Sequence, residues 1–148
     1  MKRLAYVFLL VAGLVFLDLA TKYLAETYIS PSHPKEILPF LNLVNVRNEG
    51  AAFGLFKSFG NKFFIGASSA AIIFMVVFLV KGKESTLSLS LILSGAIGNM
   101  ADRLLFGYVR DFIDVYAGRY HWPAFNVADS CLTVGLLLLL LPMKKRKT

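Results

Sequence analysis

The sequence predicts an all-α membrane protein, a bundle of four transmembrane helices with a small β-containing extracytoplasmic subdomain at the outer membrane surface. Hydrophobic residues make up 57% of the 148 positions, more than the core of a soluble domain of this size can bury. Four segments reach the length of about 20 residues that crosses roughly 30 Å of hydrocarbon. Basic residues collect at the chain ends and in one short loop. The bilayer is therefore the expected solvent.

The first predicted span is Leu4–Leu24, which follows Met1, Lys2 and Arg3. A basic start followed by an apolar run is also typical of a cleaved secretory signal. Here Asp18 and Lys22 interrupt the apolar run, no small-x-small cleavage site is evident, and the later spans are equally apolar. We therefore interpret this segment as a retained first helix.

Three further spans follow, at Lys62–Val80, Ser85–Phe106 and Ala124–Met143. Only Lys81–Glu84 separates the second from the third, which is too short for anything but a tight turn. No internal repeat, low-complexity tract or second hydrophobic unit interrupts the chain. We expect residues 1–148 to form a single membrane domain.

Basic residues near span ends favour the cytoplasmic side. The amino terminus, the Lys81–Glu84 turn and the tail Lys144–Lys147 are therefore predicted inside, which agrees with an even number of spans. Residues 25–61 and 107–123 then face outward. Within the first of these segments, Ile37–Val46 is rich in Leu, Val and Phe and is flanked by Pro and Gly, which predicts one or two strands at the membrane surface.

This topology brings the polar residues of separate segments to one level near the outer interface. The groups in question are Asp18 and Lys22 of the first span, Asn99, Asp102 and Arg103 of the third, Asp111 just beyond it, and Asn126 and Asp129 in the first two turns of the fourth. Charged groups within spans are costly and normally face the bundle interior, a partner or a functional cavity. We therefore expect a site there.

Each of these groups also has a purely structural interpretation. Asp18 and Lys22 are four residues apart, a spacing typical of helix support or snorkelling. The Asn99, Asp102 and Arg103 cluster suits either a link between helices or the wall of a site. Asp111 and Asp114 suit either solvated loop acids or half of a carboxylate pair with Asp129, whose burial needs a partner or a proton.

Several other functions are disfavoured by the inventory of reactive side chains. Cys131 is the only cysteine, and it lies two residues after Asp129, on roughly the opposite helical face. His33 and His121 look like loop residues, and no ligand cluster for zinc is present. Lys22 is a weak candidate for a serine–lysine dyad. The sequence has no basic face interleaved with aromatic residues, so binding of nucleic acid is also disfavoured.

Five motifs together resemble the bacterial lipoprotein signal peptidases, or signal peptidase II. They are Asp18-Leu-Ala-Thr-Lys22, Asn48-Glu-Gly-Ala-Ala-Phe53, Gly98-Asn-Met-Ala-Asp-Arg103, Val109-Arg-Asp-Phe-Ile-Asp114 and Phe125-Asn-Val-Ala-Asp129. Their order and spacing extend the resemblance over the whole chain. Any one of the motifs alone would be weak, but the five together are specific.

The resemblance implies a membrane aspartyl endopeptidase without metal or cofactor. Its catalytic aspartates match Asp111 and Asp129. The residues that match its site-shaping positions are Asn48, Asn99, Asp102, Arg103 and Asn126, while Asp18 and Lys22 match a motif with a structural role. One departure is Arg110, where the family more often has an aliphatic residue. A cation beside Asp111 would bias which aspartate holds a proton.

The resemblance also implies diacylglyceryl-modified prolipoproteins as substrates, cut just before the lipidated cysteine, and membrane lipid as the other partner. We expect the bacterial cytoplasmic membrane as the location of this protein, with the site near the outer face, and take a monomer as the default oligomeric state. A competing class is a small transporter or proton relay, for which intramembrane Asp and Asn are also diagnostic. A noncatalytic membrane assembly factor is a third class. It would tolerate Asp→Asn exchanges.

Overall fold

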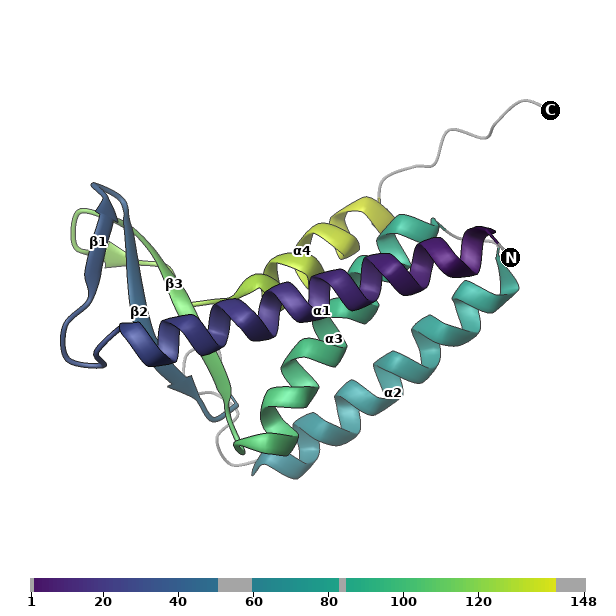
Figure 1. The fold of residues 1–148 in the computed structure, drawn as a ribbon, viewed down its shortest axis with the longest axis horizontal. Helices are drawn as coiled ribbons and strands as arrows, with labels where there is room; N and C mark the ends of the chain where they lie inside the picture. The colour runs from purple at the N-terminus through teal and green to yellow at the C-terminus, as the bar shows by residue number, and fades with distance from the viewer. Residues whose placement is uncertain (1, 51–59, 83–84, 141–148) are drawn as a thin grey trace.

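A computed structural model describes residues 2–50, 60–82 and 85–140 of the chain. In chain order the elements are α1 (Lys2–Tyr28), β1 (Lys35–Leu38), β2 (Leu41–Asn48), α2 (Gly60–Lys81), α3 (Thr86–Leu105), β3 (Val109–Ala117), β4 (Tyr120–His121) and α4 (Val127–Leu140). The helix α1 lies along the longest axis of the molecule, the other three helices run obliquely to it, and the sheet lies beyond one end of the bundle (Figure 1).

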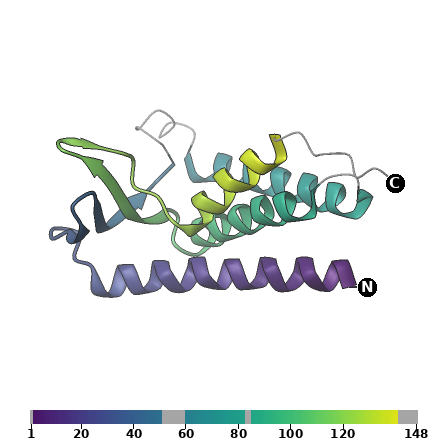
Figure 2. The same ribbon diagram turned by 90° about the horizontal axis from the view of Figure 1, so that it is seen from above.

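The helix α3 is the centre of the bundle and contacts each of the other three helices. Its buried residues include Leu89, Ile92 and Leu93, which pack with Met75 and Leu79 of α2 in one apolar cluster. Seen from above, α1 lies along one side of the layer that the other helices form (Figure 2). Near its sheet end α3 therefore buries Asn99 and Asp102 against the rest of the fold.

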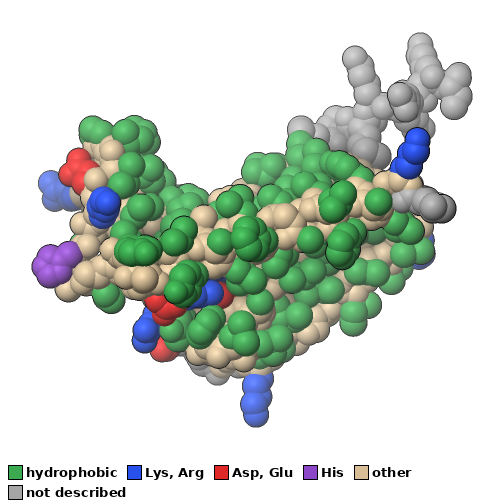
Figure 3. Space-filling view, viewed as in Figure 1, with side chains coloured by type: hydrophobic (Ala, Val, Ile, Leu, Met, Phe, Trp, Pro, Cys, Tyr) green, Lys and Arg blue, Asp and Glu red, His purple; other side chains and the backbone are tan. Residues whose placement is uncertain are grey.

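The helix exteriors are apolar. On α1 the side chains of Phe8 and Phe16 are 70% and 73% exposed, although both are large hydrophobic residues. Hydrophobic side chains cover the helices on the face drawn in Figure 3, while charged groups gather near the sheet and at helix ends. Such a surface is expected where lipid rather than water surrounds the helices.

Two described helices, α1 and α2, are long and apolar enough to cross a membrane. The helix α4 is a shorter apolar helix of 14 residues. Ser85 accepts a hydrogen bond from the Ser88 amide at the start of α3, which fixes where that helix begins. The predicted spans therefore each correspond to a helix, with shifted ends.

The ends shift most on the side of the bundle that carries the sheet. The helix α1 continues to Tyr28, four residues past its predicted end, whereas α4 begins at Val127 rather than at Ala124. Asn126 lies just before α4 instead of inside its first turns, because its side chain caps the helix. The predicted turn at Lys81–Glu84 and the basic tail lie partly or wholly outside the described residues.

The strands form one antiparallel sheet in the order β1-β2-β3-β4. The predicted strand region Ile37–Val46 is confirmed as β1 and β2. Phe112 of β3 packs with Ala25 of α1 and with Ile29 just after it, which attaches the sheet to the end of that helix. Asn45 donates hydrogen bonds to the carbonyls of Ile29, at 3.0 Å, and Glu26, at 3.5 Å.

Candidate active site

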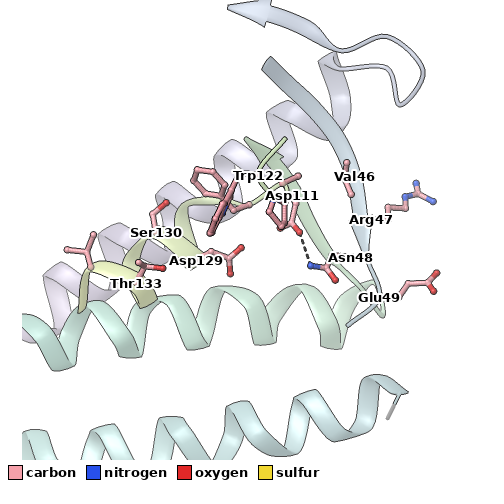
Figure 4. Close-up of a pocket in the computed structure, with 13 residues that line it drawn as sticks. Val46, Arg47, Asn48, Glu49, Asp111, Trp122, Asp129, Ser130 and Thr133 are labelled. Atoms are coloured by element: carbon pink, nitrogen blue, oxygen red, sulfur yellow. Dashed lines mark hydrogen bonds between the residues drawn. The ribbon is translucent and has the colours of Figure 1, made fainter. Parts of the chain in front are cut away.

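A cavity of about 790 Å³ opens between the end of β2, the segment after β4 and the start of α4. Its lining includes Asp111 from β3 and Asp129 from α4, along with Asn48, Trp122 and Phe125. Figure 4 shows both aspartates projecting toward this space, whereas Arg47 and Glu49 point away from them. The site thus combines two carboxylates with apolar walls.

Asp111 is held by two asparagine side chains. The Asn48 amide donates to its Oδ2 at 2.9 Å, and the Asn126 amide donates to its Oδ1 at 2.6 Å. The pairing of β2 with β3 sets Asp111 opposite Val46 and brings Asn48 within reach. Because both oxygens accept hydrogen bonds and the residue is 2% exposed, its carboxyl group has a fixed orientation.

Asp129 lies in the first turn of α4, where backbone N–H groups lack helical partners. Asn126 caps this end, because its Oδ1 accepts the Asp129 amide at 2.8 Å. The Asp129 side chain in turn accepts a hydrogen bond from the Asn99 amide at 2.7 Å. The positive end of the helix dipole favours a negative charge at this position.

The two carboxylates interact electrically. The pKa of Asp111 is raised from its ordinary value of 3.8 to about 7. Burial is the largest cause of this rise, and the charge of Asp129 is the second. Hydrogen bonds from Asn48 and Asn126 act in the opposite direction, as does the charge of Lys22. A carboxyl group with this pKa can hold or release a proton near neutral pH.

Asn99 and Asn126 join the two aspartates into one network. The Asn126 amide reaches both Asp111, at 2.6 Å, and the Asn99 oxygen, at 3.3 Å. Asn99 then bonds to Asp129 with its own amide. Each asparagine therefore touches the polar groups of at least two different elements, so a displacement of one aspartate is transmitted to the other.

Beneath this network lies a buried set of ion pairs. The Lys22 ammonium lies 2.7 Å from Asp18 and 3.4 Å from Asp102, and it donates to the Asn99 oxygen at 3.0 Å. Asp102 is also bound by Arg110, whose Nη2 lies 2.7 Å from its Oδ1. Lys22 and Asp102 are fully buried. No water is available to these charges, so each depends on its partners.

Comparison with known proteins shows to which protein family the chain is similar. The family model described as signal peptidase (SPase) II matches residues 10–144. The lipoprotein signal peptidase of Thermodesulfovibrio yellowstonii is 47% identical over 84% of this chain and 85% of its own. That of Syntrophus aciditrophicus is 39% identical over 99% of this chain and 98% of its own.

This chain belongs to the signal peptidase II family. Solved structures agree: a bacterial membrane enzyme at 2.3 Å resolution matches with a TM-score of 0.85 and 34% identity, over 97% of this chain and 94% of that one. A second solved structure of a bacterial membrane enzyme matches with a TM-score of 0.83. The helices and the small antiparallel sheet are thus a fold shared with these bacterial membrane enzymes.

The residues carried over from the family resemblance fall into three groups. Asn48, Asn99 and Asn126 contact the aspartates directly. Arg103 lies on α3 one turn beyond Asn99, and its guanidinium carbon lies 5.1 Å from the centre of the Phe64 ring. Asp102 contacts neither aspartate. Part of the Asn48–Phe53 motif, residues 51–53, lies outside the described residues.

The departure at Arg110 has a different outcome from the one expected of a cation next to Asp111. Neighbouring strand residues face opposite sides of a sheet, and Arg110 turns toward Asp102 and Glu26. Its Nη1 lies 3.1 Å from Glu26, and its backbone amide donates to Asp102 at 2.9 Å. Two carboxylates therefore neutralise this cation on the side away from the cavity.

Asp114 also lies apart from the pair. It accepts hydrogen bonds from Asn42 at 3.0 Å and pairs with His121 at 2.9 Å, on the sheet side. Among the described residues, no three His, Cys, Asp or Glu side chains converge to hold a metal ion. Cys131 is buried in α4 and is not part of the cavity lining.

Sequence reasoning missed some features of the site. Trp122, Ser130 and Thr133 line the cavity, but no motif singles them out. The strand β3 was assigned to an outward loop, although its run of Val, Phe, Ile and Tyr is a signal that could have revealed it. Asp18 accepts the Ala128 amide at 2.8 Å, a contact over 110 positions that no local pattern could indicate.

Proposed function

We propose that this protein is an aspartic endopeptidase that removes the signal peptide of prolipoproteins, cutting just before a diacylglyceryl-modified cysteine. The observation that carries the proposal is the meeting of Asp111 and Asp129 at one cavity, each oriented by asparagine amides. Membership of the signal peptidase II family supports the reaction class and the prolipoprotein substrate.

Two nearby carboxylates cannot both ionise easily, so the pair shares a proton and titrates as a unit. The ionised member accepts a proton from the attacking water, and the protonated member donates one to the carbonyl oxygen or the leaving amine. The raised pKa of Asp111, about 7, supports a pair that carries one proton at neutral pH.

Nearby donors assist in a second way. The Asn48 amide at the cavity wall already orients Asp111, and Arg103 supplies a positive charge close to both aspartates. Fixed donors and charges stabilise negative charge that develops on the peptide carbonyl during attack. These residues therefore serve the transition state without taking part in proton transfer.

We further propose that the four helices each span the bacterial cytoplasmic membrane and that the sheet and cavity lie at its outer face. The apolar exteriors of α1 and α2 support this, as do the basic chain ends. In this position the acyl chains of a substrate remain in lipid while water reaches the peptide bond. A monomer is sufficient, since one chain supplies both aspartates.

The decisive experiment incubates the purified protein with a prolipoprotein in two forms, with and without the diacylglyceryl group. We expect release of the signal peptide only from the lipidated form, without added metal and in the presence of a chelator. Absence of cleavage of the lipidated form would refute the proposal. Ion or proton flux through reconstituted vesicles in place of cleavage would favour a transporter.

A further inference from the structure

The fully buried Lys22 does more in this structure than pair with Asp18. A lysine ammonium has three N–H donors and no acceptor, so the group that faces it must be an oxygen. The Asn99 side chain meets this demand with its Oδ1 at 3.0 Å. Its NH2 group is then left on the other side, where it donates to Asp129 at 2.7 Å.

We propose that Lys22 is a positioning residue for the two aspartates, because it fixes the Asn99 amide in the only orientation that can donate to Asp129. This inference rests on the proposed peptidase function. With the amide reversed, its oxygen would face the Asp129 carboxylate, and two acceptors would repel each other. Asn126 also donates to the Asn99 oxygen, but at 3.3 Å, a longer contact between neutral groups.

The charges around Lys22 show why it remains available to Asn99. It faces Asp18 from its own helix and Asp102 from α3. Arg110 from β3 engages both Asp102 oxygens, with contacts of 2.7 to 3.3 Å. Asp102 therefore keeps a cationic partner without Lys22. In this group the charges of Lys22 and Arg110 balance those of Asp18 and Asp102. The ammonium is left to Asp18 and Asn99.

This arrangement permits a substitution that removes Lys22 without stranding a buried charge. In the double variant Asp18→Asn/Lys22→Met, the asparagine oxygen can still accept the Ala128 amide, and Asp102 keeps Arg110. Asp18→Asn alone is the matched control, because it retains the Lys22 contact with Asn99. Asp111, Asp129 and Arg103 are unchanged in both variants, so the charges around the cavity differ only through Lys22.

The experiment measures kcat, KM and the pH profile of prolipoprotein cleavage by the wild type, the control and the double variant. We expect kcat of the double variant to fall roughly tenfold to a hundredfold below the control, the range for losing a hydrogen bond to a charged group. KM stays close to the control value, since Lys22 is fully buried and cannot touch substrate. The acid limb of the profile moves to higher pH, because a cation that favours ionised aspartates is gone.

A third variant separates the hydrogen bond from the charge. Asp18→Asn/Lys22→Gln keeps an N–H donor without the positive charge, and we expect it to retain a higher kcat than the methionine variant. Equal kcat in these two would assign the loss to charge alone and overturn the positioning role. The positioning role would also be overturned if the methionine variant had the kcat and the pH profile of the control. This comparison requires an active wild type and matching melting temperatures. An inactive wild type would instead refute the peptidase proposal itself.

Discussion

Both oxygens of Asp111 accept amide hydrogen bonds, whereas Asp129 combines one such bond with the first turn of a helix. The two carboxylates therefore occupy different environments although they share one cavity. In an aspartyl pair, this difference decides how one proton is distributed between two sites. The roles of the two residues are best tested by replacements that keep volume and remove only proton transfer.

We predict that Asp111→Asn and Asp129→Asn each reduce signal-peptide release by at least three orders of magnitude, in line with the loss of an acid or base and of the pair it belongs to. The measurement is a cleavage time course with each purified variant, alongside thermal melting to exclude unfolding. Normal turnover by a folded Asp129→Asn protein would disprove the carboxylate pair.

Asp114→Asn is the matched control for these variants. Asp114 lies three residues beyond Asp111 on the same strand, but it pairs with His121 and Asn42 outside the cavity. We expect it to retain activity within about threefold of the wild type and to lose some stability, since a charged partner of His121 is removed. Inactive Asp114→Asn beside active Asp111→Asn would show that the wrong strand position was chosen.

The raised pKa of Asp111 also predicts how stability depends on pH. Because the folded state holds this proton more tightly than the unfolded chain, the stabilisation is complete below pH 3.8 and is lost as pH rises through about 7. The loss amounts to roughly 4 kcal/mol at most. We expect Asp111→Asn to melt at increasingly higher temperature relative to the wild type as pH rises from 4 to 7, with a constant difference above that. A difference that does not change with pH would contradict it.

Local patterns predicted the site residues better than their contacts. The place of Asp129 near the start of α4 followed from the span that carries it, and the motif spacing singled out Asn99 and Asn126. The partners of Lys22 did not follow, because an i,i+4 spacing to Asp18 indicates a local pair and hides a contact with a distant helix. The partners of Arg110 did not follow either, because without the recognition of β3 as a strand nothing indicated that Arg110 and Asp111 face opposite sides of a sheet.

At the scale of elements, glycine allows α3 and α4 to approach closely. A Cβ at Gly135 would lie 2.7 Å from the Ile92 side chain and 2.9 Å from the Ser88 carbonyl. A Cβ at Gly95 would collide with the carbonyl oxygen of Ala128, in the turn that carries Asp129. Small residues at such contacts are typical of helix packing in membranes. Here the close packing of α3 on α4 also sets the position of Asp129.

We predict that Gly95→Ala destabilises the protein by about 1–3 kcal/mol, the usual cost of overpacking, and also lowers kcat. The added methyl group meets backbone, which can yield only by moving the start of α4. A displacement of about 1 Å at a catalytic group can cost about a hundredfold in rate. Thermal melting and the cleavage assay measure the two effects.

Gly66→Ala on α2 is the control for that substitution, because a Cβ there has nothing within 4 Å. We expect it to leave activity unchanged and to raise stability slightly, since alanine favours helix over glycine. If both alanine variants behave alike, close packing of α3 on α4 does not position Asp129.

The element boundaries also show where sequence reasoning ends. Hydropathy marks the middle of each helix, but α1 continues past Leu24 because Ala25 and Ile29 pack under the sheet, a contact made by residues far apart in the chain. The helix α4 starts late because Asn126 is used as a cap. Neither effect has a periodic signal. The end of α1 depends on a tertiary contact, whereas the start of α4 depends on a local cap that hydropathy does not reveal.

At the scale of the whole molecule, one end of the bundle carries the sheet and the other carries the amino terminus. Arg3 joins α1 to the last turn of α2 and the first residue of α3, with hydrogen bonds to the Leu79 carbonyl at 2.8 Å and to Thr86 at 3.0 Å. The end of α4 also lies on this side (Figure 1). Among the described residues, the basic groups predicted to be cytoplasmic, Lys2, Arg3 and Lys81, are thus at the opposite end of the helices from the cavity.

This separation predicts which positions a membrane-impermeant thiol reagent reaches in intact cells. In a Cys131→Ala background, Ser32→Cys and Arg119→Cys should react from outside, because both lie in exposed parts of the sheet region. Lys81→Cys should react only after the membrane is opened, since a basic turn favours the cytoplasm. The neighbouring Gly82 and Gly118 are unsuitable for labelling, because both have a positive φ that a cysteine would adopt only with strain. Labelling of Lys81→Cys but not Arg119→Cys in intact cells would invert the topology, and it would place the cavity where exported prolipoproteins could not reach it.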